Sequence, residues 1–508
     1  MNTTHTAGIF LALLSLTALL LVGCAPRGRA LREVPTVYRR VPPATSAYIE
    51  SQASSGAKPF SCSFIEFDER GDYLDFGQHT NAYQRIQALS KSGERLMVIL
   101  YVHGWKNNSH SGDVVEFNNF LRELTNTRFV RDGGFRVHGV YFAWRGNAFR
   151  HSLDEASEAF RKTREVFDGN PIVNRSYARR GFLKPLLWIP EQVSYWNRKG
   201  AAEDKVSGVS LIRSVYTIGQ TVQHYSMKGR ENRAFLLGHS FGALMLEQSF
   251  APASLASLTA EWPWENEDMR SKARINPLPF DLTLLVNSAA PSIYAKQYHG
   301  AMVAHREALA RHKVVGSDAP LVISLTSEAD QATATAHKIA NTFAPLKPSL
   351  WRSYEGKDFI LADTNTMEKV PQHYYYQRTP GHNPLLVNHW IVKSEEPVRV
   401  APGNAFQQNI DLKPTGEIPP KTFTTTPRKE GDPRSVWRMT MQPPDPKWST
   451  YKGHAALTGS GQLQSSYWIM RCPEEIMTGH NDIWSRQAME TYAALLAEVE
   501  RLRKTEPR

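Results

Sequence analysis

The sequence predicts an α/β fold in which helices cover both faces of a mostly parallel central sheet. Short runs of apolar and β-branched residues recur along the chain, and stretches with helical periodicity lie between them. The chain has 508 residues, of which 41% are hydrophobic and 21% charged, so it is able to bury one large core. Strands that alternate with helices along such a chain favour a parallel sheet with covered faces.

The predicted strands are mostly continuous apolar runs, which is typical of strands buried on both faces of a sheet. Residues 96–105, LMVILYVHGW, are the clearest example. An earlier segment, residues 63–76, alternates and turns at Arg70 and Gly71, which is typical of a hairpin. The remaining predicted strands are residues 135–144, 234–239, 282–288, 321–327 and 466–471.

The predicted helices lie between and after these strands, and each has one apolar face. Leu211, Ile212, Val215, Ile218 and Val222 share such a face. The same spacing occurs in residues 114–124 and again in residues 488–499, after the last predicted strand.

The first residues of the chain have the pattern of a secretory signal. Residues 9–22, IFLALLSLTALLLV, form an apolar run too short to favour a membrane span, and Gly23 and Cys24 follow it. A small residue before a lone cysteine resembles a bacterial lipoprotein signal, although no Lys or Arg precedes the apolar run. The resemblance implies that residues 1–24 are a signal peptide and that a lipid on Cys24 anchors the chain. Ala25 after the cysteine resembles the pattern that sorts lipoproteins to the outer membrane, which would place the protein on the periplasmic side of a bacterial cell envelope. The alternative to a cleaved signal peptide is a short anchor that is not cleaved.

Residues 25–58 are expected to be a flexible basic tether, because they combine arginines, consecutive prolines and a Ser/Ala-rich patch. The net charge of the chain is +11, which suits an anionic membrane surface. No nucleic-acid-binding motif accompanies this charge, so nucleic acid is not expected as a partner. The sequence leaves open whether Cys62 and Cys472, the cysteines besides Cys24, form a disulfide bond.

The rest of the chain, residues 59–508, is expected to be one domain with two insertions. The segments between predicted strands at residues 146–207 and 333–464 are too long to be simple crossover connections. Both are interpreted as insertions that leave one common core and return to it. Residues 182–190, FLKPLLWIP, lie in the first insertion and are either a lid over an apolar pocket or buried packing. The sequence assigns no role to the second insertion.

Residues 235–245, FLLGHSFGALM, contain a Gly-x-Ser-x-Gly motif between a predicted strand and a predicted helix. The pattern alone is weak in a chain with 32 glycines, but its position strengthens it. A serine on a sharp strand-to-helix turn projects its hydroxyl above the sheet edge, next to a helix N-terminus. Gly238 and Gly242 are required because a Cβ at either position would crowd the turn.

With this motif the chain resembles the α/β-hydrolase superfamily, in particular its serine esterases and lipases. The resemblance implies that Ser240 is a nucleophile. It also implies an oxyanion hole made by the backbone N–H groups of Phe241 and of Trp105, the latter in the segment YVHGWKNN. His103 in that segment is interpreted as a structural residue that braces the loop, because the expected donor is main chain.

The acid of this family follows a strand between the nucleophile and the histidine. No carboxylate follows the strand at residues 282–288, where Asn287 and Ser288 stand. Glu328 and Asp330 follow the strand at residues 321–327. Asp330 is the favoured acid because it lies further past the strand end, and Glu328 is interpreted as a solvated loop charge. The acid would fix the tautomer of the histidine and stabilise its charged form.

The histidine of this family comes last in the chain order. His480 is favoured because a predicted strand and a short loop precede it and a long helix follows it. His382 and His389, in the segment TPGHNPLLVNHWI, are interpreted as structural residues and are the runners-up. Asp482 is interpreted as the N-cap of the last helix. The other histidines after Asp330 are His337, His373 and His454.

Together these residues predict a membrane-anchored serine hydrolase that cleaves small-molecule or lipid esters through Ser240, His480 and Asp330. Thioesterase, amidase and acyltransferase chemistry would use the same residues. A catalytically inactive binding or scaffold lipoprotein is the alternative from another class. No metal-ligand spacing and no phosphate-binding loop occurs in the sequence, so no metal and no cofactor is expected. The sequence leaves the oligomeric state open.

Overall fold

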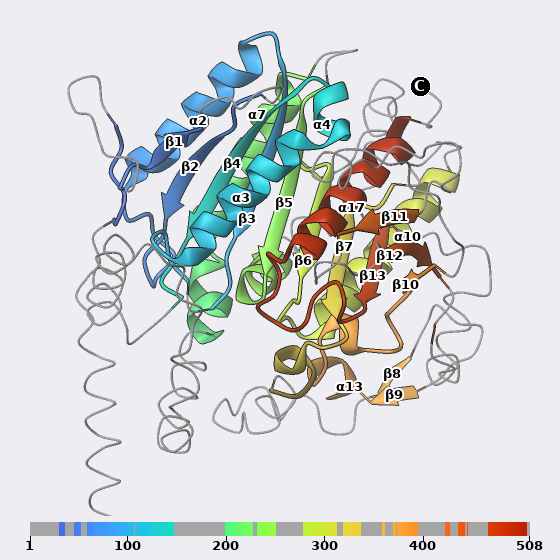
Figure 1. The fold of residues 1–508 in the computed structure, drawn as a ribbon. Helices are drawn as coiled ribbons and strands as arrows, with labels where there is room; N and C mark the ends of the chain where they lie inside the picture. Colours follow the sequence, from blue (N-terminus) through green and yellow to red (C-terminus); the bar gives the residue numbers. More distant parts are fainter. Residues whose placement is uncertain are drawn as a thin grey trace, which may run out of the picture.

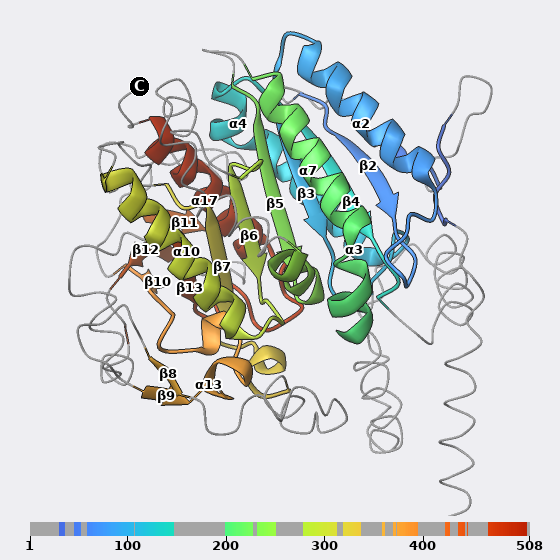
Figure 2. The same ribbon diagram turned by 180° about the vertical axis from the view of Figure 1, so that it is seen from behind.

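In a computed structural model of the chain, the described residues form one large sheet of 11 strands with helices on both faces (Figures 1 and 2). The predicted α/β class with a mostly parallel sheet is therefore confirmed. The structure describes residues 30–35, 45–51, 58–105, 107–146, 199–226, 231–249, 278–311, 319–336, 358–360, 369–371, 373–394, 422–426, 435–441, 444 and 466–504.

The strands follow the order β1-β2-β4-β3-β5-β6-β7-β13-β10-β12-β11. Every neighbouring pair from β2 to β10 is parallel, whereas β1, β12 and β11 join antiparallel at the two sides. The strands of this sheet are β1 (Tyr48–Glu50), β2 (Ser61–Glu66), β3 (Arg95–Val102), β4 (Phe135–Ala143), β5 (Arg233–His239), β6 (Leu282–Val286), β7 (Val322–Ser327), β10 (His389–Lys393), β11 (Thr422–Thr425), β12 (Ser435–Thr440) and β13 (Tyr467–Cys472).

The sheet is covered on both faces, as the continuous apolar character of its strands requires. Figure 1 shows α3, α4 and α17 in front of the sheet, and Figure 2 shows α2, α7 and α10 on the opposite face. The buried side chains form one apolar cluster on each face of the sheet. Alternate side chains along each strand point into one cluster or the other. The helices are α2 (Phe76–Lys91), α3 (Gly112–Asn126), α4 (Arg128–Asp132), α7 (Val209–His224), α10 (Ser292–Arg311) and α17 (Arg486–Lys504).

The predicted hairpin at residues 63–76 is only a tight reversal after β2. Gly71 has φ 83° in the turn, and a single antiparallel bridge joins Phe67 to Tyr73. A second strand does not follow because α2 begins at Phe76, with the side chain of Asp75 accepting a hydrogen bond from the N–H of Gly77.

Part of the second predicted insertion belongs to the central sheet. Strands β10, β11 and β12 lie within residues 333–464 and extend the sheet beyond β13. The interpretation of this whole range as an excursion from the core is therefore wrong for these strands, which lie in a range that is rich in Pro, Thr and Tyr and has little helical periodicity. The same range also contains η4 (Ala332–Ala336), β8 (Asp358–Ile360), β9 (Lys369–Pro371), α13 (His373–Tyr376) and η5 (Pro380–His382).

The described parts of the predicted tether are packed against the domain rather than flexible. Strand β1 pairs with β2 in the sheet. Arg32 is buried, and its guanidinium donates to the carbonyl oxygens of Ser109 at 2.8 Å and Ser46 at 2.9 Å. Its backbone N–H donates to the carboxylate of Glu66 at 2.8 Å. A buried arginine needs such partners, so the chain is fixed at residue 32 and the tether prediction is wrong there.

The two cysteines that the sequence left open are free thiols. Cys62 lies on β2 and Cys472 on β13, and both are fully buried. Strands β4, β3, β5, β6 and β7 separate β2 from β13, so no disulfide bond joins them.

Three predictions from the sequence lie outside the described residues. They are the signal peptide at residues 1–24 with Cys24, the apolar segment 182–190, and most of the first insertion, of which η2 (Ala202–Val206) is described. Among the described helices, none is both long and apolar enough to cross a membrane.

Candidate active site

The carboxyl ends of the parallel strands meet at one edge of the sheet, here called the carboxyl edge, and Ser240 lies there. It follows β5 directly and precedes the helix of residues 241–249. Its φ of 54° is unusual for a residue with a side chain. The turn is fixed by hydrogen bonds from the N–H of Ser240 to the carbonyl of Val286 at 3.1 Å and from the N–H of Leu244 to the carbonyl of Ser240 at 3.0 Å.

Glycines allow this turn to form next to its neighbours. A Cβ added to Gly242 would lie 2.0 Å from the carbonyl oxygen of Val102, and one on Gly238 would lie 2.9 Å from the backbone nitrogen of Ala243. Both contacts are with backbone that is unable to move aside, as the motif predicted. Gly104 lies close to the same turn, because a Cβ added to it would lie 3.0 Å from the Cβ of Ser240.

His480 reaches Ser240 from the loop between β13 and α17. Its Nε2 lies 2.7 Å from the Oγ of Ser240, and its Nδ1 lies 3.0 and 3.1 Å from the two carboxylate oxygens of Asp330. A carboxylate only accepts hydrogen bonds, so Nδ1 carries the proton and the Nε2 lone pair faces the serine hydroxyl. The structure thus brings together Ser240, His480 and Asp330.

Asp330 is fully buried, and its surroundings keep it ionised. Burial acts to raise the pKa of the Asp330 carboxyl, but the charge of His480 and hydrogen bonds from His480 and Thr333 outweigh burial and lower the pKa to about 2. Thr333 donates to the carboxylate through both its side chain and its backbone N–H. The other carboxylate, Glu328, lies at the surface 3.7 Å from Arg471, whereas the hydrogen bonds to His480 Nδ1 come from Asp330.

The runner-up histidines do not hold the position of His480. His382 is partly buried beside the acid, with its Nε2 3.2 Å from the Oγ of Thr333. His389 begins β10, bonds to Asn388 and stacks on Trp468. Of the remaining candidates, His337 and His454 lie outside the described residues, and for His373 only the backbone is described.

His103 braces the loop after β3, as the sequence predicted. Its Nδ1 donates to the carbonyl of Gly104 at 2.8 Å, and its Nε2 accepts from the N–H of Trp144 at 3.1 Å. Burial lowers the pKa of His103 to about 4, so its ring is neutral. Trp105 comes next in this loop, and its ring lies 6.4 Å from that of Phe241, so the two segments meet beside Ser240.

Asp482 has a different role from the predicted one. Helix α17 begins at Arg486, and the Oγ of Ser485 accepts from the N–H of Ala488 at 3.2 Å, so Ser485 is the N-cap. Asp482 instead accepts hydrogen bonds from the N–H and hydroxyl of Thr478 at 2.8 and 2.9 Å. It therefore closes the turn that contains His480.

Asn287 and His239 are residues of the site to which the sequence analysis gave no role. Asn287 has φ 46° at the end of β6, and its amide donates to the carbonyl of His480 at 3.1 Å. The Nε2 of His239 lies 2.9 Å from the same carbonyl oxygen. The available sequence signal was their position at the ends of two predicted strands, but a contact with a distant backbone carbonyl leaves no pattern in the chain.

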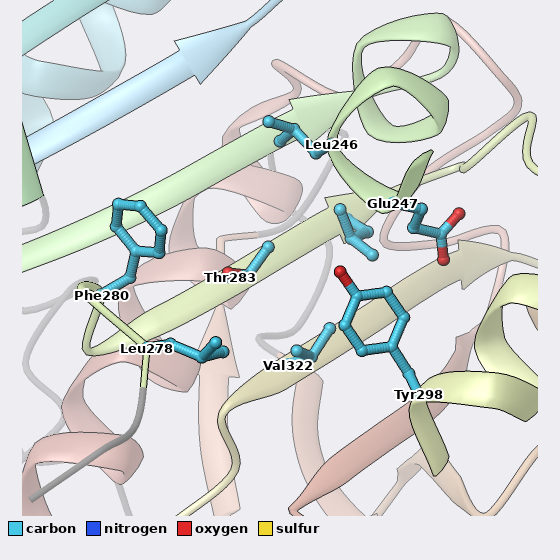
Figure 3. A pocket seen from close by; sticks show the side chains of 8 residues that line it. Leu246, Glu247, Leu278, Phe280, Thr283, Tyr298 and Val322 are labelled. Atoms are coloured by element: carbon cyan, nitrogen blue, oxygen red, sulfur yellow. The ribbon is translucent and has the colours of Figure 1, made fainter. Parts of the chain in front are cut away.

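A separate small cavity lies beneath the helix of residues 241–249. Leu246 and Glu247 of this helix face Phe280 and Tyr298 across it (Figure 3). Its volume is about 10 Å³, so it has no room for an acyl chain. Glu247 is held there by hydrogen bonds from Ser288 at 2.8 Å and Tyr467 at 3.1 Å.

Comparisons of this chain with protein-family models, with curated proteins and with solved structures gave no match. Among the described residues, no group of three or more His, Cys, Asp or Glu side chains has the geometry of a metal site.

Proposed function

We propose that the protein is a serine hydrolase of the α/β-hydrolase type that cleaves carboxylic esters. The observation that carries this proposal is the chain of hydrogen bonds from Ser240 through His480 to Asp330. Structural networks of Ser, His and Asp also occur in proteins, but here the serine has a strained positive φ on a strand-to-helix turn. This combination is typical of an activated nucleophile.

The topology supports the same proposal. The nucleophile follows β5, the acid follows β7 and the histidine follows β13, which is the chain order Ser, acid, His of α/β-hydrolases. The order β5-β6-β7-β13 within the sheet places these three strand ends near one another.

The proposed reaction begins with attack of the Ser240 Oγ on the ester carbonyl. His480 Nε2 takes the hydroxyl proton and then gives it to the leaving alcohol, and an acyl-enzyme forms on Ser240. The same nitrogen then takes a proton from a water molecule, which attacks the acyl-enzyme; His480 gives that proton to the Ser240 Oγ as the bond to the acyl group breaks and the acid leaves. Asp330 stays ionised throughout and stabilises the imidazolium that forms in each half of the reaction.

The backbone N–H groups of Trp105 and Phe241 are the proposed oxyanion hole. The close approach of Gly104 to Ser240 puts the loop of Trp105 beside the nucleophile, and Phe241 is the first residue of the following helix. Loss of one such donor typically raises the barrier by about 3 kcal/mol.

We further propose that the enzyme is anchored through a lipid on Cys24, in the outer membrane of a bacterium and facing the periplasm. The substrate class is small-molecule or lipid esters, and the chemistry requires no cofactor. The docking of Arg32 limits the reach of the anchor, because only a few residues separate Cys24 from a point fixed on the domain.

A fluorophosphonate probe tests the nucleophile. The wild type is expected to be labelled at Ser240, and Ser240→Ala to remain folded and unlabelled. If the folded wild type is not labelled, the proposal of a serine hydrolase is rejected, and the alternative of a catalytically inactive binding protein is favoured. Rates on nitrophenyl esters of increasing chain length, compared with matched thioesters and amides, would then define the acyl group and the bond cleaved.

The mass of the N-terminal peptide from membrane-extracted protein tests the anchor. A diacylated or triacylated Cys24 is the expected result, and an intact Met1 peptide would contradict it.

A further inference from the structure

We propose that Asn287 and His239 are positioning residues that hold the main-chain carbonyl of His480 and thereby place its imidazole between Asp330 and Ser240. The inference rests on the proposed function, because it concerns the base of the proposed reaction. Neither residue touches the reacting atoms.

The loop that carries His480 has no strand to hold it. Strand β13 ends at Cys472 and α17 begins at Arg486, so residues 473–485 cross the carboxyl edge without pairing in the sheet. A distance of 2.7 Å between His480 and Ser240 therefore depends on side chains that bind this loop. Near His480, the anchored points are the carbonyl of Met477, which accepts from the hydroxyl of Ser327 at 2.6 Å, and the carbonyls of Gly479 and His480. Further along the loop, the carbonyl of Ile483 accepts from the hydroxyl of Tyr492, and the ring N–H of Trp484 donates to Asp113.

Asn287 donates hydrogen bonds to the carbonyls of Gly479 and His480. Its amide nitrogen donates to His480 at 3.1 Å and to Gly479 at 3.4 Å, while its amide oxygen accepts from the N–H of Ser327 at 3.0 Å. The oxygen contact fixes the amide orientation, so the nitrogen must face the loop. Asn287 is fully buried, so its amide groups are shielded from water and depend on these partners.

The backbone of Asn287 indicates a role beyond packing. Among the described residues, the two non-glycine residues with positive φ are Ser240 at 54° and Asn287 at 46°. They stand just after the adjacent strands β5 and β6. Such conformations are strained for a residue with a side chain and persist where the surrounding structure enforces them, which is typical of functional sites. At Asn287 this conformation occurs where the side chain reaches His480.

His239 provides the second donor to the same oxygen. A carbonyl only accepts, so the His239 Nε2, 2.9 Å away, carries the proton. Burial, followed by the charge of His480, lowers the pKa of His239 to about 3, so the ring is neutral at neutral pH. Neutrality matters because the ring centres of His239 and His480 are 5.1 Å apart, and a charged His239 would oppose formation of the His480 imidazolium.

Holding the carbonyl acts on catalysis through geometry. The serine proton moves only over a short, aligned hydrogen bond, and a displacement of about 1 Å typically costs about 10²-fold in rate. Substrate does not contact either donor in this scheme. Loss of a donor should therefore lower kcat and leave KM nearly unchanged.

The test uses matched variants of the full-length protein. Asn287→Gly removes the amide but tolerates positive φ without strain. His239→Gln keeps a donor near the position of Nε2, whereas His239→Leu removes it. The control is Asn388→Gly, because the Asn388 amide likewise bonds two main-chain groups, Tyr467 O at 3.0 Å and Ile469 N at 2.8 Å, but on the body of β13.

Two readouts are compared: kcat and KM on a nitrophenyl ester per folded molecule, and hydrogen exchange of the amides in residues 473–485. We expect Asn287→Gly and His239→Leu each to lower kcat about 10-fold with unchanged KM, and to speed exchange in this loop. His239→Gln should recover most of the lost rate, and Asn388→Gly should match the wild type in both readouts.

A wild-type kcat in Asn287→Gly and His239→Leu, or a change in KM alone, would overturn the inference while leaving the proposed function intact. If the wild type itself is inactive, the proposed function fails, and hydrogen exchange still decides whether the two residues hold the loop. Unchanged exchange in residues 473–485 of Asn287→Gly would then reject the inference by itself.

Discussion

The Nδ1 of His480 lies 3.0 Å from one carboxylate oxygen of Asp330 and 3.1 Å from the other, although 150 positions separate the two residues in the chain. The carboxylate fixes which imidazole nitrogen carries the proton. Because the opposite nitrogen faces Ser240 at 2.7 Å, this contact decides whether the serine meets a base or an N–H group.

Replacing Asp330 with asparagine should reverse that arrangement. The amide would donate to Nδ1, so Nε2 would carry the proton and Ser240 would lose its base. We expect kcat on a nitrophenyl ester to fall by about 10⁴-fold with little change in KM. Glu328→Gln is the matched control, since Glu328 pairs with Arg471 at the surface, and it should keep wild-type activity. If Asp330→Asn and Glu328→Gln had equal activity, Asp330 would have no role in catalysis.

Adding one methyl group at Gly242 should destabilise the fold. The Cβ of Gly242→Ala would lie 2.0 Å from the carbonyl oxygen of Val102, which belongs to the central strand β3 and is unable to give way. We expect the free energy of unfolding to fall by about 3 kcal/mol or more, measured by urea denaturation. Gly300→Ala, in α10 with no neighbour within 4 Å of the new Cβ, should instead raise it by about 1 kcal/mol. Similar midpoints for both variants would contradict the tight approach at the turn.

Glu247 should make stability depend on pH. Burial raises the pKa of its carboxyl from 4.5 to about 7, against the lowering effect of hydrogen bonds from Ser288 and Tyr467. The folded protein therefore holds this proton more tightly than the unfolded chain, so unfolding releases it between about pH 4.5 and 7. The free energy of unfolding should fall as the pH rises through that window, by up to about 3 kcal/mol.

The measurement is urea denaturation of the wild type and Glu247→Gln at a series of pH values. Glu490, whose pKa burial also raises to about 7, affects both proteins equally and cancels from their difference. The free energy of unfolding of Glu247→Gln minus that of the wild type should therefore increase as the pH rises. Parallel curves for the two proteins would show that Glu247 does not titrate in this range.

The thiols of Cys62 and Cys472 should be inert in the folded protein. Both are fully buried, and burial raises the pKa of Cys62 to about 12 and also raises that of Cys472. A disulfide-exchange reagent should find no reactive thiol at either position in native protein and both after denaturation. A reducing agent should leave Tm unchanged, whereas a lower Tm on reduction would indicate a disulfide bond.

Much of the fold could be predicted because strands and helices leave local patterns. The runs at 96–105, 135–144, 234–239, 282–288, 321–327 and 466–471 correspond to β3, β4, β5, β6, β7 and β13. Strands β10, β11 and β12 were missed because they lie in a part of the sequence that is rich in Pro and Thr and has little helical periodicity between its short apolar runs. The packed arginine at residue 32 was missed because a buried guanidinium and a solvated one have the same local sequence.

By itself, the sequence determined the class of fold and the positions of Ser240, Asp330 and His480 at predicted strand ends, since periodicity and strand ends are local properties. Only the tertiary structure decided that Asp330 rather than Glu328 meets His480, that Asp482 closes a turn, and that Asn287 and His239 bind the His480 carbonyl. The three contacts with His480 depend on the order β5-β6-β7-β13 across the sheet, whereas the turn of Asp482 is a local one that the loop can form only once it is placed. That order follows from how the whole chain buries its apolar faces, and no short segment contains it.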